Sequence, residues 1–553
     1  MADVEVPVLI VGAGPVGATA SILLSQLGVA NYVVDRRPGP HRAPQAHVVN
    51  PRSLEIFRAM GFDMRALRAA ATPRADGAEV AFVTTLTGTE LGRLPYERQG
   101  DDALVLTPEP LMNLSQHRLE PLLVDRLRAE PNAALQWRHE WQGLDQDATG
   151  VTSRIRDLDG GEDYVVRSRW VLAADGAGSR VRTAVGIEPI GPDQLQTFIM
   201  IHFEANLRPL VRERPAILYW VVSPECAGTF VAHHIDHTWV FMHRYDPETE
   251  PPATFTTDVC AAIVRRAIGR DDVALTIRDV SPWTMTAQVA ERFRSERVFL
   301  VGDSAHRFPP SGGLGLNTGV QDAHNLAWKL AWVERGLAAP ALLDTYEAER
   351  RPVAQNNAEQ SFVNAMKILE AFMALSSTDD LAHMRNVIAD QQDHFDMIGL
   401  QLGFSYEEGA VVADGSTPPV RANPVRDFVP TSRPGARLPH AWIERDGARQ
   451  STLDLLARDG LTLITGSRGQ VWAEVAARVA SPTVHCLVAG RDFSDVDGAW
   501  QRVCEIEPDG ALLVRPDQHV AWRTRRAPSD PAAALAAVVE QVLRRPAGPA
   551  PIG

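Results

Sequence analysis

Three short segments, far apart in the chain, have the residue types that bind a dinucleotide. They are Gly12-Ala13-Gly14-Pro15-Val16-Gly17, Asp175-Gly176 and Gly302-Asp303. Glycines let a turn pass close to a pyrophosphate, and free amides at the start of a following helix stabilise its negative charge. Together the three segments predict a large dinucleotide such as FAD, bound along its whole length.

The first segment has the neighbours that a nucleotide-binding turn requires. Residues 8–11 predict a strand, residues 18–27 a helix, and residues 32–34 a second strand that ends at Asp35. An acid at this spacing is expected to accept hydrogen bonds from an adenosine ribose. A glycine-rich turn can serve packing alone, but this context favours nucleotide binding. The predicted contacts are Gly12, Gly14, Pro15, Val16, Gly17 and Asp35.

The third segment stands in the densest pattern of the chain. A strand is expected at 298–301, and residues 309–317 read Pro-Pro-Ser-Gly-Gly-Leu-Gly-Leu-Asn before a helix that runs to Trp332. With Pro44-Gln45-Ala46-His47 upstream, the chain resembles the flavin-dependent aromatic hydroxylases, the class A flavoprotein monooxygenases with the p-hydroxybenzoate hydroxylase fold. The resemblance covers nearly the whole chain and is greatest to the phenol and dichlorophenol monooxygenase branch.

The resemblance implies an α/β fold: a Rossmann-like FAD-binding domain, an inserted antiparallel-sheet substrate domain and a C-terminal thioredoxin-like domain. The last domain has no CxxC, which excludes dithiol exchange and leaves a structural role or a contact in a homo-oligomer. Helical periodicity is also expected over 111–127. The expected boundaries are 1–190 (FAD-binding domain, first part, with a sheet-rich insertion at about 75–110), 191–295 (substrate domain), 296–375 (FAD-binding domain, second part, and long helix), 376–434 (helix and proline-rich linker) and 435–553 (last domain).

The resemblance also implies a reaction. FAD would be reduced by NADPH or NADH, react with dioxygen to a flavin C4a-hydroperoxide, and pass one oxygen atom to a phenolic or polycyclic aromatic substrate. Only one GxGxxG segment occurs, as is expected of a family that has no separate nicotinamide domain. The choice between NADH and NADPH stays open.

Several further residues are expected to contact FAD. By the likeness, Asp303 would bind its ribityl and pyrophosphate region, and Asp175 would support both FAD and nicotinamide binding. Apart from the likeness, Gly313 and Gly315 would let the backbone approach a flat ring. The amides of Leu316 and Asn317, at a helix start, would stabilise negative charge on a reduced flavin. By the likeness, Arg36 and Gln116 would also contact the cofactor, and the other predicted contacts are Gln45, Gly302 and Pro310.

The base that ionises a phenol is predicted to be His47, in the place where phenol hydroxylases can have an acid. Histidine titrates near neutral pH, which suits a base or a proton relay. The alternative is a hydrogen bond to backbone beside the flavin. Pro310 is predicted to take part in catalysis as well, and His306 to make a structural hydrogen bond. The predicted substrate contacts in the inserted sheet are Tyr219 and His234.

The composition of the chain limits the kinds of partner that it is expected to bind. The chain has 553 residues, a formal net charge of −14 and a pI near 5.6, which disfavours nucleic acid and anionic membranes as partners. No segment approaches membrane-spanning length and no signal peptide is evident, so a cytoplasmic enzyme is expected. The cysteines lie far apart, which indicates neither disulfides nor a metal site. They are Cys226, Cys260, Cys486 and Cys504.

Two other classes of protein share the nucleotide-binding segments. A flavin-dependent halogenase is expected to have an active-site lysine and a Trp-x-Trp-x-Ile-Pro signature, but the only lysines here, Lys329 and Lys367, lie in helical patterns after the flavin loop. A non-catalytic protein that binds flavin or a product would keep the segments but would not consume NAD(P)H.

Overall fold

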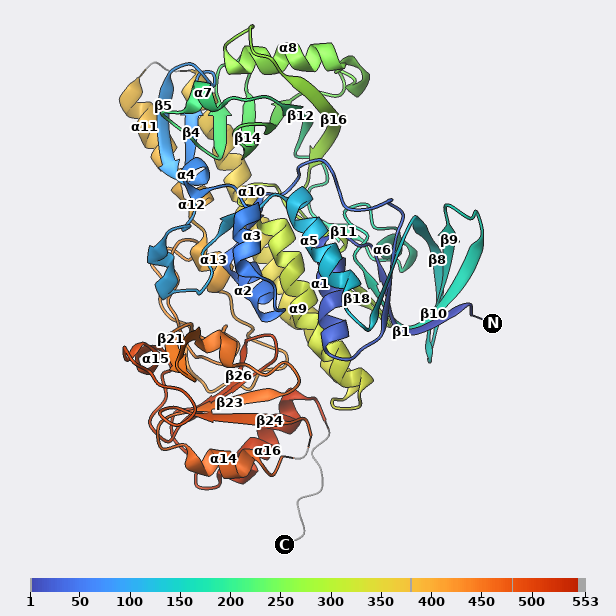
Figure 1. Cartoon of the computed structure of the whole chain (residues 1–553), viewed down its shortest axis with the longest axis vertical. Coiled ribbons are helices and arrows are strands. Elements are labelled where there is room, and N and C mark those ends of the chain that lie inside the picture. The colour runs from blue at the N-terminus through green and yellow to red at the C-terminus, as the bar shows by residue number, and fades with distance from the viewer. Residues whose placement is uncertain (1, 378–379, 480, 546–553) are drawn as a thin grey trace.

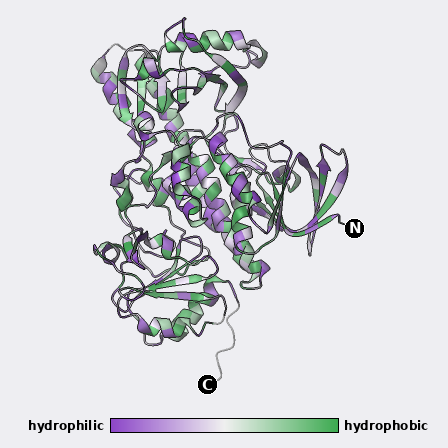
Figure 2. Cartoon of the chain, in the orientation of Figure 1, coloured by the Kyte–Doolittle hydropathy of each residue, from purple (hydrophilic) through white to green (hydrophobic). Residues whose placement is uncertain are grey.

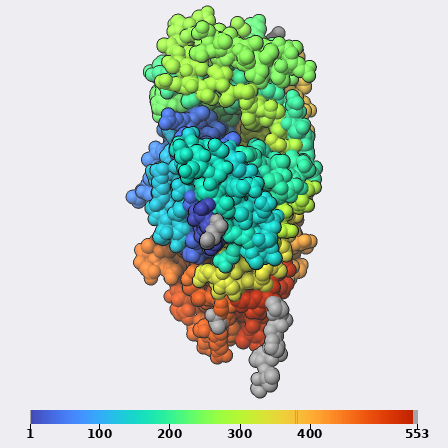
Figure 3. Space-filling model, turned by 90° about the vertical axis from the view of Figure 1, so that its right-hand side faces the viewer, coloured from blue at the N-terminus to red at the C-terminus, as the bar shows by residue number. Residues whose placement is uncertain are grey.

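The computed structural model describes residues 2–377, 380–479 and 481–545. Three parts follow one another along the long axis of the molecule: a mostly antiparallel sheet with helix α8 (Thr257–Ile268) at one end, an α/β body in the middle, and a C-terminal domain at the other end (Figures 1 and 3). The body is therefore the part that the other two contact.

The body is built on a sheet whose central strands are parallel. Strand β1 (Val4–Val11) pairs with β2 (Asn31–Asp35) on one side and with β10 (Asp163–Ala173) on the other, and β10 pairs with β19 (Val298–Leu300). The buried valine, isoleucine and leucine runs of these strands are typical of a parallel sheet that is covered on both faces. The remaining strands are β7 (Ala133–Trp137), β8 (His139–Asp147), β9 (Gly150–Asp157) and β18 (Arg294–Ser295).

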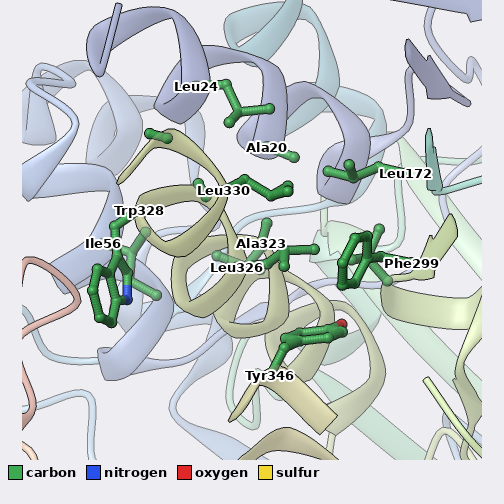
Figure 4. Packing of buried hydrophobic residues seen from close by; sticks show 14 of the residues in the cluster. Ala20, Leu24, Ile56, Leu172, Phe299, Ala323, Leu326, Trp328, Leu330 and Tyr346 are labelled. Carbon is green, nitrogen blue, oxygen red and sulfur yellow. The ribbon is translucent and has the colours of Figure 1, made fainter. Parts of the chain in front are cut away.

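Helix α9 (Leu314–Glu334) runs through the centre of the body. Of its 21 residues, 17 are buried, so it is enclosed on all sides and its polar side chains need partners inside the protein. Side chains from five other segments pack around it (Figure 4). Those labelled there, apart from the residues of α9, are Ala20 and Leu24 of α1 (Pro15–Gln26), Ile56 of α2 (Pro51–Ala59), Leu172, Phe299, and Tyr346 of α10 (Thr345–Ser376).

The end sheet has seven strands, and segments from two distant parts of the sequence build it. Helix α8 (Thr257–Ile268) covers one face, and α10 and α11 (Leu381–Ala389) pack against the other. The segment expected as an insertion near 75–110 supplies two of the strands. In spatial order the strands are β16 (Thr276–Met285), β12 (Gln196–Glu204), β15 (Thr238–Arg244), β14 (Gly228–His234), β13 (Leu218–Val221), β4 (Glu79–Val83) and β5 (Glu90–Pro95).

Helix α5 (Gln116–Arg128) begins five residues later than its periodicity predicts. Residues Met112–Asn113 form β6 and pair antiparallel with β3 (Val48–Val49). The pairing holds this stretch extended, so the helix starts only at Gln116. It also brings residue 47 beside Asn113.

The C-terminal domain has a four-stranded mixed sheet with helices packed on it. Its central strand, β23 (Leu461–Thr465), pairs in parallel with β24 (Val484–Val488) and antiparallel with β25 (Ala511–Val514). The proline-rich stretch at residues 417–439, which precedes this sheet, contacts the body, for example where Arg437 pairs with Glu55. The other elements are β26 (Val520–Thr524), α14 (Gln470–Ala476), α15 (Ala499–Val503), α16 (Pro531–Val542), the hairpin β21 (Trp442–Arg445) and β22 (Ala448–Ser451), and the linker helices α12 (Gln392–Phe395) and α13 (Ile398–Leu402).

Short elements connect these parts. Apolar and polar residues are interspersed along the ribbon (Figure 2), and no helix within the described residues is long and apolar enough to cross a membrane. The short elements are α3 (Met64–Ala70), α4 (Arg74–Gly77), α6 (Arg180–Ala184), α7 (Arg208–Val211), β11 (Pro189–Ile190), β17 (Gln288–Ala290) and β20 (His306–Arg307).

Candidate active site

The three predicted nucleotide-binding segments lie at one edge of the body sheet. They follow the carboxyl ends of β1, β10 and β19, which are neighbours in the sheet, and this edge is where open α/β sheets bind ligands. The segments also touch one another. A Cβ on Gly12 would come 2.2 Å from the carbonyl oxygen of Ala174, and one on Gly302 would come 2.9 Å from Val16. Chain segments almost 300 residues apart thus form one continuous surface.

The glycines divide into those that packing requires and those that it does not. A Cβ on Gly17 would stand 1.9 Å from the carbonyl oxygen of Gly12, so protein packing alone demands glycine there. A Cβ on Gly14 would have only one side-chain atom of Arg37 within 4 Å, at 3.9 Å, and one on Gly315 would have none. The backbone at these two glycines is therefore open to close approach by another molecule, as the binding of a dinucleotide would require.

The acid at the end of β2 lies as predicted beside the glycine-rich turn. Asp35 Oδ2 accepts a hydrogen bond of 2.8 Å from the amide of Ala13. The cation beside it is Arg37, whose guanidinium lies 3.0 Å from Asp35 and 3.4 Å from the buried Glu120. The side chain of Arg36, the predicted contact, is exposed on the surface.

The predicted contacts Gln45 and Gln116 are brought together. The amide of Gln116 donates to the carbonyl oxygen of Ala46 over 2.7 Å, and its side chain donates to Glu120 over 2.7 Å. Gln45 is exposed. The start of α5 therefore holds the segment that precedes His47 against the nucleotide-binding edge.

The second segment is tied to the third by a buried arginine. Asp175 accepts hydrogen bonds from Ser179 Oγ (2.5 Å) and from the amide of Val181 (3.1 Å), so its carboxylate caps the short helix α6. Burial raises the pKa of Asp175. From α6, Arg182 donates to the carbonyl oxygens of Ser304 (2.9 Å) and Ala177 (3.3 Å).

The side chain of Asp303 is accessible to water although many protein atoms surround it. Its side chain is exposed, yet surrounding protein atoms desolvate it enough to raise the pKa of the carboxyl group above its ordinary value. A group that water reaches although protein surrounds it lies in a recess. This position suits the predicted contact with the polar middle of a dinucleotide.

The loop before α9 has two consecutive glycines in the left-handed region. Gly312 has φ +99° and Gly313 has φ +62°, conformations that other residues rarely adopt. Pro310 is exposed, and its carbonyl oxygen accepts from the amide of Gly313 over 3.0 Å. Leu316 lies in the first turn of α9, where amides have no acceptor within the helix.

The side chain of Asn317 fixes this loop to the segment that follows His47. It donates to the carbonyl oxygens of Val48 (3.0 Å) and Gly313 (2.7 Å), and it accepts from the amide of Asn50 (2.9 Å). In addition, a Cβ on Gly313 would come 2.6 Å from Val48. The loop and His47 therefore lie in the same small region.

His47 lies where the body meets the end sheet. Its ring centroid is 5.8 Å from that of His233, on β14, and 6.1 Å from that of Tyr96, on the segment after β5. Burial lowers the pKa of His47 to about 4, and its contact with Asn113 offsets only part of that effect. The imidazole is therefore neutral at physiological pH.

A chain of amide groups determines which nitrogen of His47 carries the proton. Asn113 Nδ2 donates to Gly77 O and to Gln99 Oε1, each over 3.2 Å, which leaves Asn113 Oδ1 as the acceptor that faces His47 Nδ1 at 3.2 Å. Gln99 is oriented in turn because its Nε2 donates to two backbone carbonyl oxygens. Nδ1 of His47 is then the donor, and Nε2 has the free lone pair that can accept a proton.

The structure corrects the prediction that Tyr219 contacts the substrate. Tyr219 is fully buried beneath α8, and its hydroxyl accepts from the amide of Ala216 (2.8 Å) and donates to the carbonyl oxygen of Arg214 (3.0 Å). Side chains alternate between the two faces of a strand, so the next residue, Trp220, faces α10 instead. Its ring lies 5.7 Å from Phe372 and 6.3 Å from Phe82.

The structure also corrects the prediction that His234 contacts the substrate, at a point where the register of β14 shifts between Ala232 and His234. This residue ends β14, and its ring stacks on that of His237 at 3.9 Å beside the turn, away from His47. Its neighbour His233 is buried, bonds Ser115 through Nδ1 and contacts the ring of His47. Strand propensity alone does not give the face, because a shift of one residue exchanges both sets of side chains.

Two other residues have internal roles. His306 makes the structural hydrogen bond expected of it, 2.7 Å from Nε2 to Asp322. Lys329 is fully buried and forms an ion pair of 2.7 Å with Glu349, so it is not available as the halogenase lysine. Within the described residues, no group of three or more histidines, cysteines or acids is arranged to hold a metal ion.

Comparison with known proteins identifies the family. The FAD binding domain family matches residues 5–361, and the aromatic-ring hydroxylase C-terminal family matches residues 431–546. The 2,4-dichlorophenol 6-monooxygenase of Cupriavidus pinatubonensis is 35% identical over 98% of this chain and 97% of its own. The chain belongs to the FAD-binding aromatic-ring hydroxylases, a class of flavin-dependent monooxygenases.

Two solved structures are similar over their whole length. The flavin-dependent monooxygenase PieE, in complex with FAD and substrate, has a TM-score of 0.93 and 38% identity, with coverage of 99% of this chain and 100% of that one. Aklavinone-11 hydroxylase, with FAD and aklavinone, has a TM-score of 0.86 and 33% identity at the same coverage. The relatives thus include enzymes named for 2,4-dichlorophenol and for aklavinone.

Proposed function

We propose that this chain is an FAD- and NAD(P)H-dependent monooxygenase that hydroxylates a phenolic or polycyclic aromatic compound. The observation that carries the proposal is the position of His47: a desolvated, neutral imidazole that lies between the nucleotide-binding edge and the inner face of the end sheet. The names of the relatives support the class of substrate but not the particular ring.

The residues at the sheet edge are suited to hold FAD. Asp35 would accept from the ribose, and the amides of the glycine-rich turn and of helix α1 would bind the pyrophosphate. When bound, FAD supplies the redox chemistry that activates dioxygen. The amides at the start of α9, including Leu316, would stabilise negative charge on the ring. The other proposed contacts are Gly14, Gln45, Gln116, Asp303, Pro310, Gly315 and Asn317.

His47 would accept the proton of the substrate hydroxyl at Nε2. Removal of this proton makes the aromatic ring a stronger nucleophile, and a neutral imidazole has its lone pair free to accept the proton. Because Asn113 holds Nδ1 in the donor form, the imidazole need not exchange tautomers first. The proposed neighbours of the substrate's aromatic ring are Tyr96, His233 and Trp220. Tyr96 and His233 adjoin the imidazole of His47, and Trp220 lies on the face of the end sheet that α10 covers.

The last domain is proposed to be thioredoxin-like with a structural role. Its mixed sheet of parallel β23–β24 and antiparallel β23–β25–β26, with α14 and α16 packed on it, supports this fold. The domain's cysteines, Cys486 and Cys504, are 18 residues apart in the sequence, so the redox motif of that fold is absent.

The test mixes the purified protein, reconstituted with FAD, with NADH or NADPH, dioxygen and a panel of single-ring and polycyclic phenols. We expect a compound on the panel to stimulate NAD(P)H oxidation and to yield a product with one more oxygen atom. Absence of flavin reduction with every compound would favour the non-catalytic alternative. A halogenated product in the presence of chloride would favour the halogenase.

A further inference from the structure

Asp322 lies near the middle of α9 and is completely buried. A buried carboxylate is costly unless opposite charges and hydrogen bonds compensate it, so its partners show what it holds in place. Asp322 has partners on both of its oxygens, and they come from two different parts of the molecule.

One oxygen holds the third nucleotide-binding segment. Asp322 Oδ2 accepts from the amide of Gly302 over 3.2 Å and from His306 Nε2 over 2.7 Å. These two residues bracket Asp303, so both ends of the short segment 302–306 are tied to the same carboxylate. The ring of His306 is fixed further by stacking on Phe308 at 4.8 Å.

The other oxygen holds an arginine of α10. Asp322 Oδ1 accepts from Arg350 Nε over 2.8 Å, and both side chains are fully buried. Although burial by itself would raise it, the pKa of Asp322 is lowered because the charges and hydrogen bonds of His306 and Arg350 outweigh desolvation. The carboxylate therefore stays ionised and binds both sides strongly.

Arg350 continues the connection toward the C-terminal domain. Its Nη1 donates to the hydroxyl of Tyr406 over 3.3 Å. The ring of Tyr406 stacks on His519 of the C-terminal domain, with centroids 4.3 Å apart, and the guanidinium of Arg515 lies 5.2 Å from its centre. Direct contacts thus lead from the segment 302–306 through Asp322, Arg350 and Tyr406 to the last domain.

We propose that Asp322 is a positioning residue that holds the segment 302–306 in its FAD-binding shape and that the docking of the C-terminal domain acts on that segment through Arg350. The inference rests on the proposed FAD site. It assigns the last domain, which has no redox motif, a part in cofactor binding. Asp322 itself need not touch the cofactor.

The test compares Asp322→Asn with Glu55→Gln in the full-length protein. Glu55 is the matched control because it is also a buried carboxylate between the body and the C-terminal domain, paired with Arg437 (2.5 Å) and Arg52 (3.2 Å). Its third side-chain partner is Thr107, at 2.7 Å, so these bonds do not reach the segment 302–306. Both variants should lower the melting temperature.

FAD binding is measured by fluorescence titration of the apo-proteins at a temperature well below the melting of every variant. We expect the Kd for FAD to rise about tenfold or more in Asp322→Asn and less than about twofold in Glu55→Gln. Equal changes in the two variants would overturn the proposal. If the wild-type protein binds no FAD, the proposed function fails instead.

A milder variant decides the matter if Asp322→Asn does not fold. Tyr406→Phe removes only the hydroxyl that Arg350 contacts, and we expect the Kd for FAD to rise about two- to threefold with a nearly unchanged melting temperature. An unchanged Kd in Tyr406→Phe would overturn the connection to the C-terminal domain.

Discussion

Near His47, burial neutralises the ionisable side chains, whereas between α9, α10 and the C-terminal domain ion pairs keep them charged. Burial lowers the pKa of His47 to about 4 and raises that of Glu97 to about 8. In the second region burial opposes the charged form as well, but Arg515 and Lys329 lower the pKa of Glu349 to about 2. His47 is half-buried and Glu349 is fully buried, but protein atoms desolvate both side chains, and their different charge states follow from their partners.

The partners follow from what each region has to do. Around His47 they are neutral amides such as Asn113 and Gln99, which orient an imidazole without charging it. Between α9, α10 and the C-terminal domain, ionised side chains lie close to oppositely charged ones, as with Arg515 and Glu349 at 2.7 Å. Such pairs fix how two parts dock, because a lone charge left inside is severely destabilising. The first arrangement suits proton transfer and the second suits rigid assembly.

The largest effect is expected where a charge of the second region is left alone. Arg515→Met leaves the carboxylates of Glu349 and Asp517 without their main cation, and we expect a loss of about 3–5 kcal/mol in the free energy of unfolding, measured by urea denaturation. Arg270→Gln, which breaks the exposed pair with Asp272, is the control and should leave the midpoint unchanged. A similar midpoint for wild type and Arg515→Met would contradict the contrast between the regions.

Removal of the imidazole from the first region should affect chemistry rather than assembly. His47→Ala is expected to slow substrate hydroxylation about 100-fold, the lower end of what general-base catalysis contributes. The Kd for FAD should change less than about threefold, and the melting temperature little. Undiminished coupled turnover in His47→Ala would remove this residue from the proposed role.

A third substitution gives His47 a charged partner, like the partners of the side chains between α9, α10 and the C-terminal domain. Asn113→Asp places a carboxylate 3.2 Å from His47 Nδ1 and should raise the pKa of that imidazole from about 4 toward neutrality. The base form is then lost as pH falls through the raised pKa, so we expect kcat/KM at pH 6 to drop about tenfold relative to pH 8. In the wild-type enzyme this ratio should stay near one. Identical pH profiles would argue against His47 as the base.

The smallest effect concerns Glu97, which accepts from the amide of Met397 and from Gln401, each over 3.1 Å. Its native pKa of about 8 lies above the unfolded value near 4.5, so between these values the native state binds more protons and stability falls as pH rises. Glu97→Gln should remove this dependence, which amounts to at most about 1.4 kcal/mol for each pH unit between pH 5 and pH 8 in urea denaturation. An equally steep pH dependence in the variant would show that Glu97 is already ionised in the native state.

The fold and the family could be predicted from the sequence because each nucleotide-binding segment carries its own context. The turn at Gly12 stands between a strand and a helix, and Asp35 follows the next strand, so local spacing alone indicated their arrangement. The family profiles confirm that assignment. The contacts of individual residues with FAD stay predictions.

The faces of the inserted sheet could not be predicted, because consecutive residues on a strand differ only in the side to which they point. Tyr219 and Trp220 are equally good strand residues, and the packing of α8 and α10 decides between them. Asp322 was missed for another reason. An acid in a helical pattern is usually a surface residue, and only the three-dimensional structure shows that α9 is enclosed.

The most direct test of the account is the origin of the oxygen atom in the product. In ¹⁸O₂, with FAD, NAD(P)H and a compound that stimulates turnover, mass spectrometry should find one ¹⁸O atom in the hydroxylated ring for each NAD(P)H consumed productively. A hydroxylated product whose added oxygen comes from water would contradict the proposed monooxygenase.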